Sequence, residues 1–132
     1  MTTSGPMTGF SHVQLLVTDL AASEVWYTTV LGLTRYAADE SKGYVALRHD
    51  ASGVVIVLTP RAPDAGDGTT LDHLAFAVPD GAVLDAWATH LTEAGIDHPG
   101  VVSELGKPSL QLRDPDGIAI ELVAPAPAAS PS

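Results

Sequence analysis

The sequence predicts an α+β fold built from two consecutive βαβββ modules, because one pattern of residues occurs twice along the chain. FSHVQLLVTD at residues 10–19 aligns without gaps with LDHLAFAVPD at 71–80. Each segment has a histidine in third place, then a largely apolar run, and an aspartate at its end. At the same offset Trp26 aligns with Trp87, and both lie in stretches whose apolar residues recur with helical spacing.

The end of each module repeats as well. SGVVIVLTP at 52–60 and DGIAIELVAP at 116–125 both continue from a turn glycine into an aliphatic strand. The difference that matters for chemistry lies at one position, where the first copy has Val57 and the second has Glu121. A carboxylate in the middle of an apolar strand calls for a chemical reason.

Each predicted element follows from a local pattern. The first strand of each module ends at an aspartate, which suits the N-cap of the helix that follows. The helices end near Gly32 and Gly95, because glycine readily adopts the conformation that terminates a helix. Three shorter strands then complete each module, the last after a turn sequence. The expected elements are 10–18, 20–31, 33–37, 44–49 and 54–59 in the first module, and 71–78, 81–94, 101–104, 109–113 and 118–123 in the second.

Length and composition fit one folded domain over residues 10–124, with module one at about 10–60 and module two at about 71–124. We expect residues 1–9 to be flexible and residues 125–132, rich in Pro, Ala and Ser, to form a disordered tail. The 132 residues include no cysteine, which excludes disulfides and thiolate metal ligands. The net charge of −10 argues against a nucleic-acid partner. With no visible secretory signal or membrane-spanning run, we expect a cytoplasmic protein without membrane contact.

Strand parity places two histidines and a glutamate on faces that do not pack against the helices. Successive strand residues point to opposite faces. The aliphatic alternate positions form the helix-facing side, so His12 and His73 fall on the other side of the two first strands, and Glu121 on the same side of the last strand. A divalent cation held by two imidazoles and one carboxylate would compensate the charge of this glutamate. Alternatively, the histidines are ordinary core or surface residues and Glu121 pairs with an arginine.

The segments SHVQLLVTDL, DHLAFAVPD and RDPDGIAIELV resemble the signatures of the vicinal oxygen chelate superfamily, also called the glyoxalase/bleomycin resistance/extradiol dioxygenase family. The resemblance extends over nearly all of residues 10–124. It implies that the paired modules form a cup-shaped, barrel-like mixed sheet, flanked by helices, around a divalent metal ion. It further implies His12, His73 and Glu121 as the ligands, and a small-molecule substrate that binds through neighbouring oxygens. A homodimer is expected, with the ligands supplied by one chain or by two.

The resemblance leaves three functions open. Glyoxalase I enzymes use a further glutamate at the position of Val57, so a four-ligand site of that kind is absent. The remaining His/His/Glu set is similar to that of extradiol dioxygenases and of fosfomycin-modifying thiol transferases, of which fosfomycin modification ranks lower. It favours an extradiol dioxygenase with Fe²⁺, while Mn²⁺, Ni²⁺, Zn²⁺ or Co²⁺ suit the same ligands. A glyoxalase-like lyase or isomerase is the first alternative. A metal-free drug- or metabolite-binding resistance protein is the second.

Four further polar residues are candidates for the site. Gln14, Ser109 and Gln111 are expected on or near the face that carries the metal ligands, where they orient a substrate or simply line the site. His49, near the end of its strand, is a candidate catalytic acid or base, or else an exposed residue at the edge of a turn.

Two tryptophans and one lysine complete the predictions. Trp26 and Trp87 are expected to anchor the helices to the sheets as core residues. Lys107 is either an ordinary surface lysine or a contact for an anionic substrate.

Overall fold

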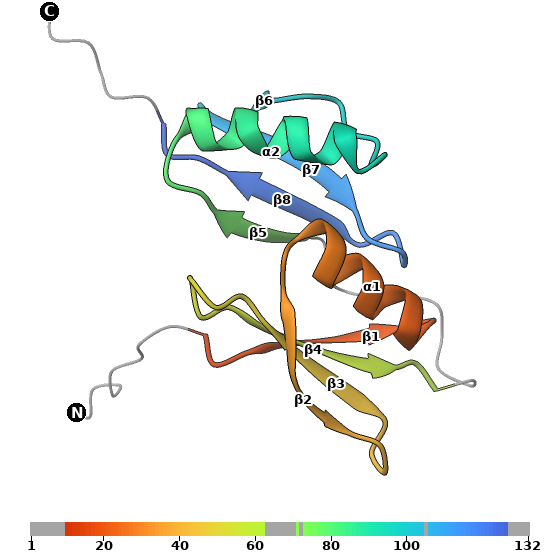
Figure 1. The fold of residues 1–132 in the computed structure, drawn as a ribbon. Coiled ribbons are helices and arrows are strands. Elements are labelled where there is room, and N and C mark those ends of the chain that lie inside the picture. The colour runs from red at the N-terminus through yellow and green to blue at the C-terminus, as the bar shows by residue number, and fades with distance from the viewer. Residues whose placement is uncertain (1–9, 63–70, 72, 105, 127–132) are drawn as a thin grey trace, which may run out of the picture. The chain divides into compact units, whose positions relative to one another are not determined.

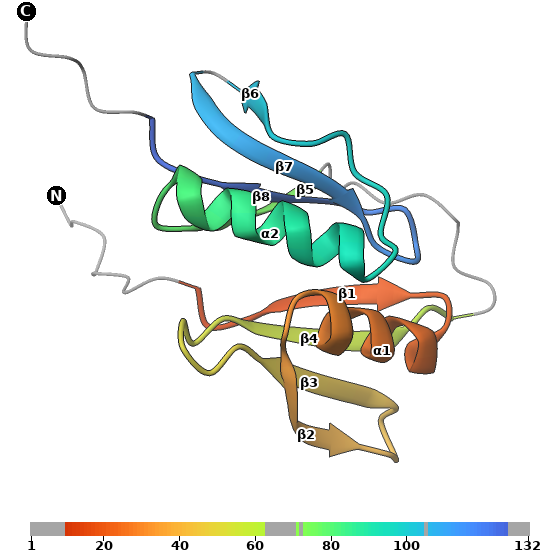
Figure 2. The same ribbon diagram turned by 45° about the horizontal axis from the view of Figure 1, so that its top comes forward.

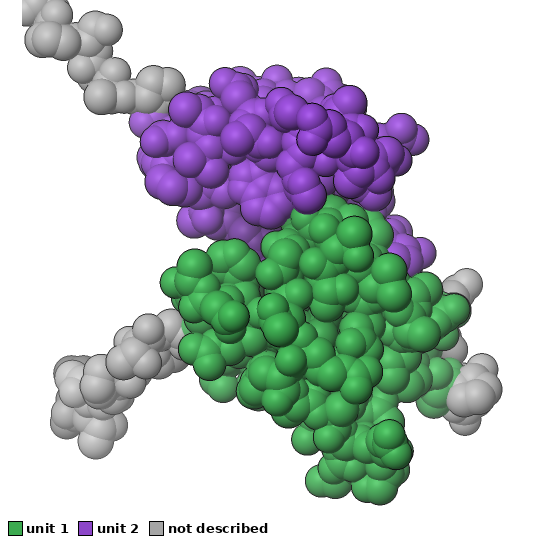
Figure 3. Space-filling view, in the orientation of Figure 1, with its two compact units in different colours: residues 1–65 green, residues 66–132 purple. Residues whose placement is uncertain are grey.

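The computed structural model contains the two βαβββ modules in the predicted order (Figures 1 and 2). It describes residues 10–62, 71, 73–104 and 106–126. Most of the two termini predicted to be flexible or disordered therefore lies outside the described residues. The chain divides into two compact units, residues 1–65 (unit 1) and residues 66–132 (unit 2), which Figure 3 colours separately.

Every predicted helix and strand is present, with ends that differ by a few residues. Unit 1 consists of β1 (Val13–Val17), α1 (Leu20–Val30), β2 (Thr34–Asp39), β3 (Tyr44–Arg48) and β4 (Val55–Pro60). Unit 2 consists of β5 (His73–Ala77), α2 (Gly81–Glu93), β6 (Val102–Glu104), β7 (Lys107–Arg113) and β8 (Ala119–Val123). None of the helices in the described parts of the chain is long and apolar enough to cross a bilayer.

Both units share one sheet topology. The strand orders are β1-β4-β3-β2 and β5-β8-β7-β6, so the first strand of each unit pairs with the last. This pair is parallel and the other pairs are antiparallel. The described strands thus form two separate four-stranded sheets and do not close into one barrel, which corrects the barrel-like sheet implied by the sequence resemblance.

The aliphatic faces predicted by parity form the core of each unit. In unit 1, Leu15 and Val17 of β1 and Ile56 and Leu58 of β4 are buried, while α1 packs against β3 and β4. In unit 2 the buried residues are Leu110, Leu112, Ile120 and Leu122 on β7 and β8, whereas Leu74 and Phe76 of β5 are only partly buried, and α2 packs against β7. Each such side chain stabilises the fold by about 1.5–3 kcal/mol relative to an exposed one. The opposite face of each sheet is therefore left for polar residues.

Aspartates begin both helices, as predicted. The Asp19 carboxylate accepts a hydrogen bond from the Ala22 amide at 3.0 Å, and the Asp80 carboxylate accepts one from the Val83 amide at 2.9 Å. These bonds satisfy amides that have no partner inside the first turn of a helix. They fix where each chain segment leaves the first strand and turns back over the sheet.

The aromatic anchor of α1 is Tyr27, which corrects the prediction made for Trp26. Tyr27 is fully buried, whereas Trp26 is only partly buried and contacts the Tyr27 ring edge-on at 5.0 Å between centroids. Trp87 is likewise partly buried on α2, where its ring lies 5.7 Å from that of His90. A helix presents only part of its surface to the sheet, and in α1 that side consists of Ser23, Tyr27 and Val30.

Exchange of Tyr27 for alanine should therefore destabilise the protein far more than exchange of Trp26. We expect Tyr27→Ala to cost about 3–5 kcal/mol, because it opens a cavity in a packed core. Trp26→Ala should cost clearly less, because part of its ring already contacts solvent. Urea unfolding followed by far-UV circular dichroism measures both. Equal losses of stability would show that Trp26 anchors α1 as strongly as Tyr27 does.

Candidate functional site

His73 and Glu121 lie next to each other on the polar face of unit 2. Parallel pairing of β5 with β8 sets His73 opposite Ala119 and Ala75 opposite Glu121, so the two side chains are diagonal neighbours on one face. The His73 Nε2 atom lies 3.6 Å from a Glu121 carboxylate oxygen. The Glu121 side chain retains 20% of its exposure and that of His73 retains 44%. The pair is therefore accessible to a small ligand while its carboxylate is largely shielded.

Gln111 supports the carboxylate from the next strand. It stands opposite Glu121 in the β7–β8 register, and its side-chain amide donates a long hydrogen bond of 3.5 Å to Glu121 Oε1. Ser109, two residues earlier, has the same parity and pairs with Val123, but its side chain is fully buried. Its Oγ has no hydrogen-bond partner among the described residues. Gln111 thus borders the His73–Glu121 pair, whereas Ser109 is buried, and a substrate-binding role for either residue stays a prediction.

His12 occupies the equivalent position in unit 1, immediately before β1. Its Nδ1 lies 3.1 Å from the Ser11 hydroxyl, an arrangement that leaves Nε2 for another ligand. In the β1–β4 register Gln14 stands opposite Val57, just as Ala75 stands opposite Glu121 in unit 2. The structure thereby confirms that Val57 occupies the place of Glu121 in the repeat.

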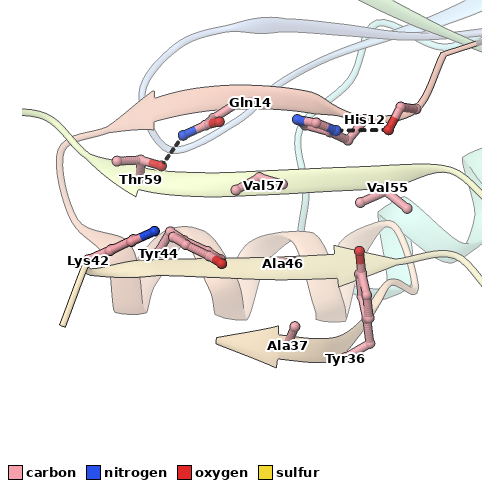
Figure 4. Close-up of a pocket in the computed structure, with 11 residues that line it drawn as sticks. His12, Gln14, Tyr36, Ala37, Lys42, Tyr44, Ala46, Val55, Val57 and Thr59 are labelled. Atoms are coloured by element: carbon pink, nitrogen blue, oxygen red, sulfur yellow. Dashed lines mark hydrogen bonds between the residues drawn. The ribbon is translucent and has the colours of Figure 1, made fainter. Parts of the chain in front are cut away.

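Unit 1 has a pocket of about 560 Å³ on the sheet face that carries Gln14 and Val57 (Figure 4). Figure 4 shows His12, Val55 and Tyr36 toward one end and Gln14, Thr59 and Lys42 toward the other, with Val57 and Ala46 between them. The Gln14 side-chain amide donates a 2.7 Å hydrogen bond to the Thr59 hydroxyl. The lining residues are Ser11, His12, Gln14, Tyr36, Ala37, Lys42, Tyr44, Ala46, Val55, Val57 and Thr59.

Two irregularities in β2 and the turn after it bring Tyr36 and Lys42 to this pocket. The β2–β3 register shifts between Arg35 and Ala37, so adjacent residues Tyr36 and Ala37 both line the pocket. After β2, the Asp39 carboxylate accepts hydrogen bonds from the Ser41 hydroxyl at 2.7 Å and the Lys42 amide at 3.1 Å. These bonds hold the pKa of Asp39 below its usual range, and the bond from Ser41 has the largest effect. Sequence reasoning missed Tyr36 and Lys42, because simple alternation predicts neither a bulge nor the path of a turn. It also missed Thr59, although alternation from Val57 places Thr59 on the same face of β4.

His49 lies in the β3–β4 turn and has a structural role there. Its Nδ1 lies 2.7 Å from the Ser52 hydroxyl and accepts a 3.3 Å hydrogen bond from the Ser52 amide. Its backbone amide bonds to the Val54 carbonyl at 2.9 Å. His49 is absent from the described lining of the unit 1 pocket. These bonds explain why a histidine suits this turn, and the catalytic role of His49 stays a prediction.

Of the three predicted ligands, the structure brings together His73 and Glu121. His12 belongs to the other unit, and the described residues contain no assembled group of three or more histidine, aspartate or glutamate side chains. The donor chemistry nevertheless fits a divalent metal ion. Imidazole nitrogens and a carboxylate bind Fe²⁺, Mn²⁺, Ni²⁺ and Zn²⁺, and Glu121 offers a largely shielded negative charge with a supporting amide.

Comparison with known proteins agrees with the fold. The protein YaeR of Escherichia coli is 30% identical over 128 residues, covering 84% of this chain and 92% of that protein. A glyoxylase/bleomycin resistance protein/dioxygenase domain from Frankia is 28% identical with a TM-score of 0.77, covering 90% of this chain and 98% of that one. FosX, a fosfomycin resistance protein of Listeria monocytogenes, shares the fold at 20% identity with a TM-score of 0.68, covering 89% and 90%. A variant of FosX was crystallised with Mn(II) and a dihydroxypropylphosphonic acid.

A sequence profile of one family covers nearly all of both units. The match extends over residues 9–122 and therefore includes every helix and all but the final residue of the strands described above. The chain belongs to the Glyoxalase/Bleomycin resistance protein/Dioxygenase superfamily.

Proposed function

We propose that this chain is a metal-dependent enzyme whose divalent cation is held by His12, His73 and Glu121. The observation that carries the proposal is the distance of 3.6 Å between His73 Nε2 and a Glu121 oxygen, on a face where their neighbours on β5 and β8 include small alanines. The two strands present a nitrogen and an anionic oxygen side by side, as a metal site requires. An ordinary structural ion pair would account for His73 and Glu121, but it would not account for the second histidine, His12, at the equivalent position of unit 1.

The chain's own residues would prepare these ligands for binding. Ser11 lies at the Nδ1 atom of His12 and so favours ligation through Nε2, the same atom that faces Glu121 in His73. Gln111 directs one oxygen of Glu121 by its hydrogen bond. A bound divalent cation would act as a Lewis acid and orient a substrate through two neighbouring oxygens. The remaining polar groups then have to position the substrate and exclude competing water.

Among the reactions of the superfamily, we favour extradiol-type oxidative cleavage with Fe²⁺. Two histidines and one carboxylate form the ligand set of many non-haem iron oxygenases and leave positions for both substrate and O₂. Val57 supplies no further carboxylate, which disfavours a four-ligand glyoxalase-type centre. A glyoxalase-like lyase or isomerase remains the alternative, because the same three ligands can also hold Ni²⁺ or Zn²⁺.

Loss of the Glu121 carboxylate should abolish tight metal binding while the fold persists. We expect Glu121→Val, which copies unit 1, and Glu121→Gln to lower the affinity for Mn²⁺ at least about 100-fold, because a ligand and its charge are removed. Isothermal titration calorimetry measures this loss. Glu93→Gln, the same charge change at an exposed position on α2, serves as the control and should bind like the wild type.

Metal content distinguishes this enzyme from a metal-free binding protein. Protein purified without chelator, or reconstituted with Fe, Mn, Ni, Co or Zn, should contain about one metal ion per chain in elemental analysis, because the repeat supplies only one such glutamate. Failure of all five metals to bind would favour the metal-free drug- or metabolite-binding alternative.

The choice between dioxygenase and lyase rests on which metal supports which reaction. Protein loaded anaerobically with Fe²⁺ should turn over catechols on addition of O₂, with the strong visible absorbance of a ring-opened product and stoichiometric oxygen uptake. The same protein loaded with Ni²⁺ or Zn²⁺ is then tested with hemithioacetals of glutathione. Activity only in the second assay would overturn the dioxygenase assignment and establish the lyase.

We further propose that the enzyme is a homodimer, and mixing of two inactive variants tests whether its ligands come from one chain or two. His12→Ala and Glu121→Gln chains are unfolded together and refolded as a mixture. If each site combines His12 of one chain with His73 and Glu121 of the other, about one quarter of the wild-type metal capacity should return, since only heterodimers contain an intact site. No recovery would place all three ligands within one chain.

A further inference from the structure

The unit 1 pocket differs in charge from the chain as a whole. The chain has 16 acidic and 6 basic residues, yet the described residues that line the pocket include a lysine and no aspartate or glutamate. A pocket that is lined by an ammonium group and by no carboxylate is suited to an anion, even in an acidic protein. The overall charge of −10 is therefore a poor guide to what this pocket binds.

Lys42 is available to an anionic ligand. In the described parts of the chain its ammonium group forms no ion pair, and the neighbouring Asp39 carboxylate is engaged by the Ser41 hydroxyl and the Lys42 backbone amide. The turn thus fixes the backbone of Lys42 and leaves the side chain to extend over the sheet. Figure 4 shows Lys42 at the same end of the pocket as Thr59.

Thr59 adds a directed donor beside this charge. Its oxygen accepts the hydrogen bond from Gln14, which leaves the hydroxyl proton to donate to a ligand. An ammonium group and a hydroxyl at one end of a cavity suit a carboxylate, whose two oxygens accept one bond from each.

The rest of the pocket matches an apolar body of limited length. Val57 and Ala46 form the middle, with Tyr44 beside them, and His12 lies toward the far end (Figure 4). From Val55 to Thr59 the strand rises about 13 Å, at roughly 3.3 Å per residue. A ligand with an aromatic ring and a short acidic side chain spans most of this distance.

We propose that Lys42 and Thr59 form a binding subsite for a carboxylate of the substrate, whose apolar body lies over Val57 and whose metal-binding oxygens lie toward His12. This inference rests on the proposed function only for the position of those oxygens. Lys42 is here a specificity-determining residue: it contacts the substrate at the end remote from the ligands and takes no part in bond breaking. Aromatic acids with two neighbouring hydroxyls are the substrate class that fits both ends.

A matched pair of ligands tests the subsite. 3-(3,4-Dihydroxyphenyl)propionate and its amide have the same catechol and nearly the same shape, and they differ in charge. We expect the Mn²⁺-loaded wild type to bind the acid about fivefold more tightly than the amide at low ionic strength, the size typical of a partly exposed charge pair. This preference should shrink at high salt. Isothermal titration calorimetry under nitrogen measures both affinities.

Variants then assign the preference to Lys42. Lys42→Gln should bring the acid-to-amide ratio to about one, and Lys42→Arg should keep most of it, because charge is retained. Lys107→Gln tests the alternative contact for an anionic substrate: it removes the same charge from the exposed lysine of unit 2 and should leave the ratio unchanged. A wild-type ratio of one, or a ratio that Lys107→Gln abolishes and Lys42→Gln does not, would overturn the inference.

The same titrations separate this subsite from the metal site. If neither probe binds more tightly with Mn²⁺ than without it, the proposed function fails, while an acid preference that depends on Lys42 still supports the subsite. If Mn²⁺ tightens both probes equally and the acid shows no preference, the subsite fails and the metal site stands.

Discussion

Parallel hydrogen bonding between the first and last strands is the constraint on which the chemistry of each unit depends. In unit 2 this register aligns Ala75 with Glu121 and so sets His73 diagonally beside the carboxylate. In unit 1 the same register aligns Gln14 with Val57, and the equivalent place is apolar. A slip of one residue would turn each strand over and move these side chains into the aliphatic core. The buried leucines and isoleucines under the helices therefore hold the polar face in place.

Most of the fold could be predicted from the sequence because its signals are local and occur twice. Aspartates at the starts of helices, glycines at their ends and strict alternation in the last strands each specify one element. The repeat then checks every assignment against a second copy. The pairing of His73 with Glu121 could be foreseen for the same reason, since parity and equivalent position both pointed to one face. The separation of the strands into two sheets could not, because local patterns do not specify which edges join.

The residues that sequence analysis missed depend on irregular backbone. Tyr36 reaches the pocket only because the register of β2 shifts beside it, and Lys42 only because the Asp39 turn directs it. Neither feature changes the pattern of apolar residues. The rotation of α1 about its axis explains why the prediction of Trp26 as the core anchor was wrong. Trp26 and Tyr27 are adjacent, and small changes in helix orientation decide which of them faces the sheet. Ser109 was placed on the correct face, yet its burial depends on surrounding packing rather than on parity.

The partial exposure of the two tryptophans has a practical consequence for spectroscopy. The chain has two tryptophans, and each unit contains one of them, on its helix. Their indole rings lie partly in solvent and partly against protein, so their emission is sensitive to local rearrangement without being essential to the core. Trp26→Phe and Trp87→Phe variants would each retain a single fluorophore that reports on one unit. The molecule thus carries built-in optical probes with which the motions and ligand responses of its halves can be followed separately.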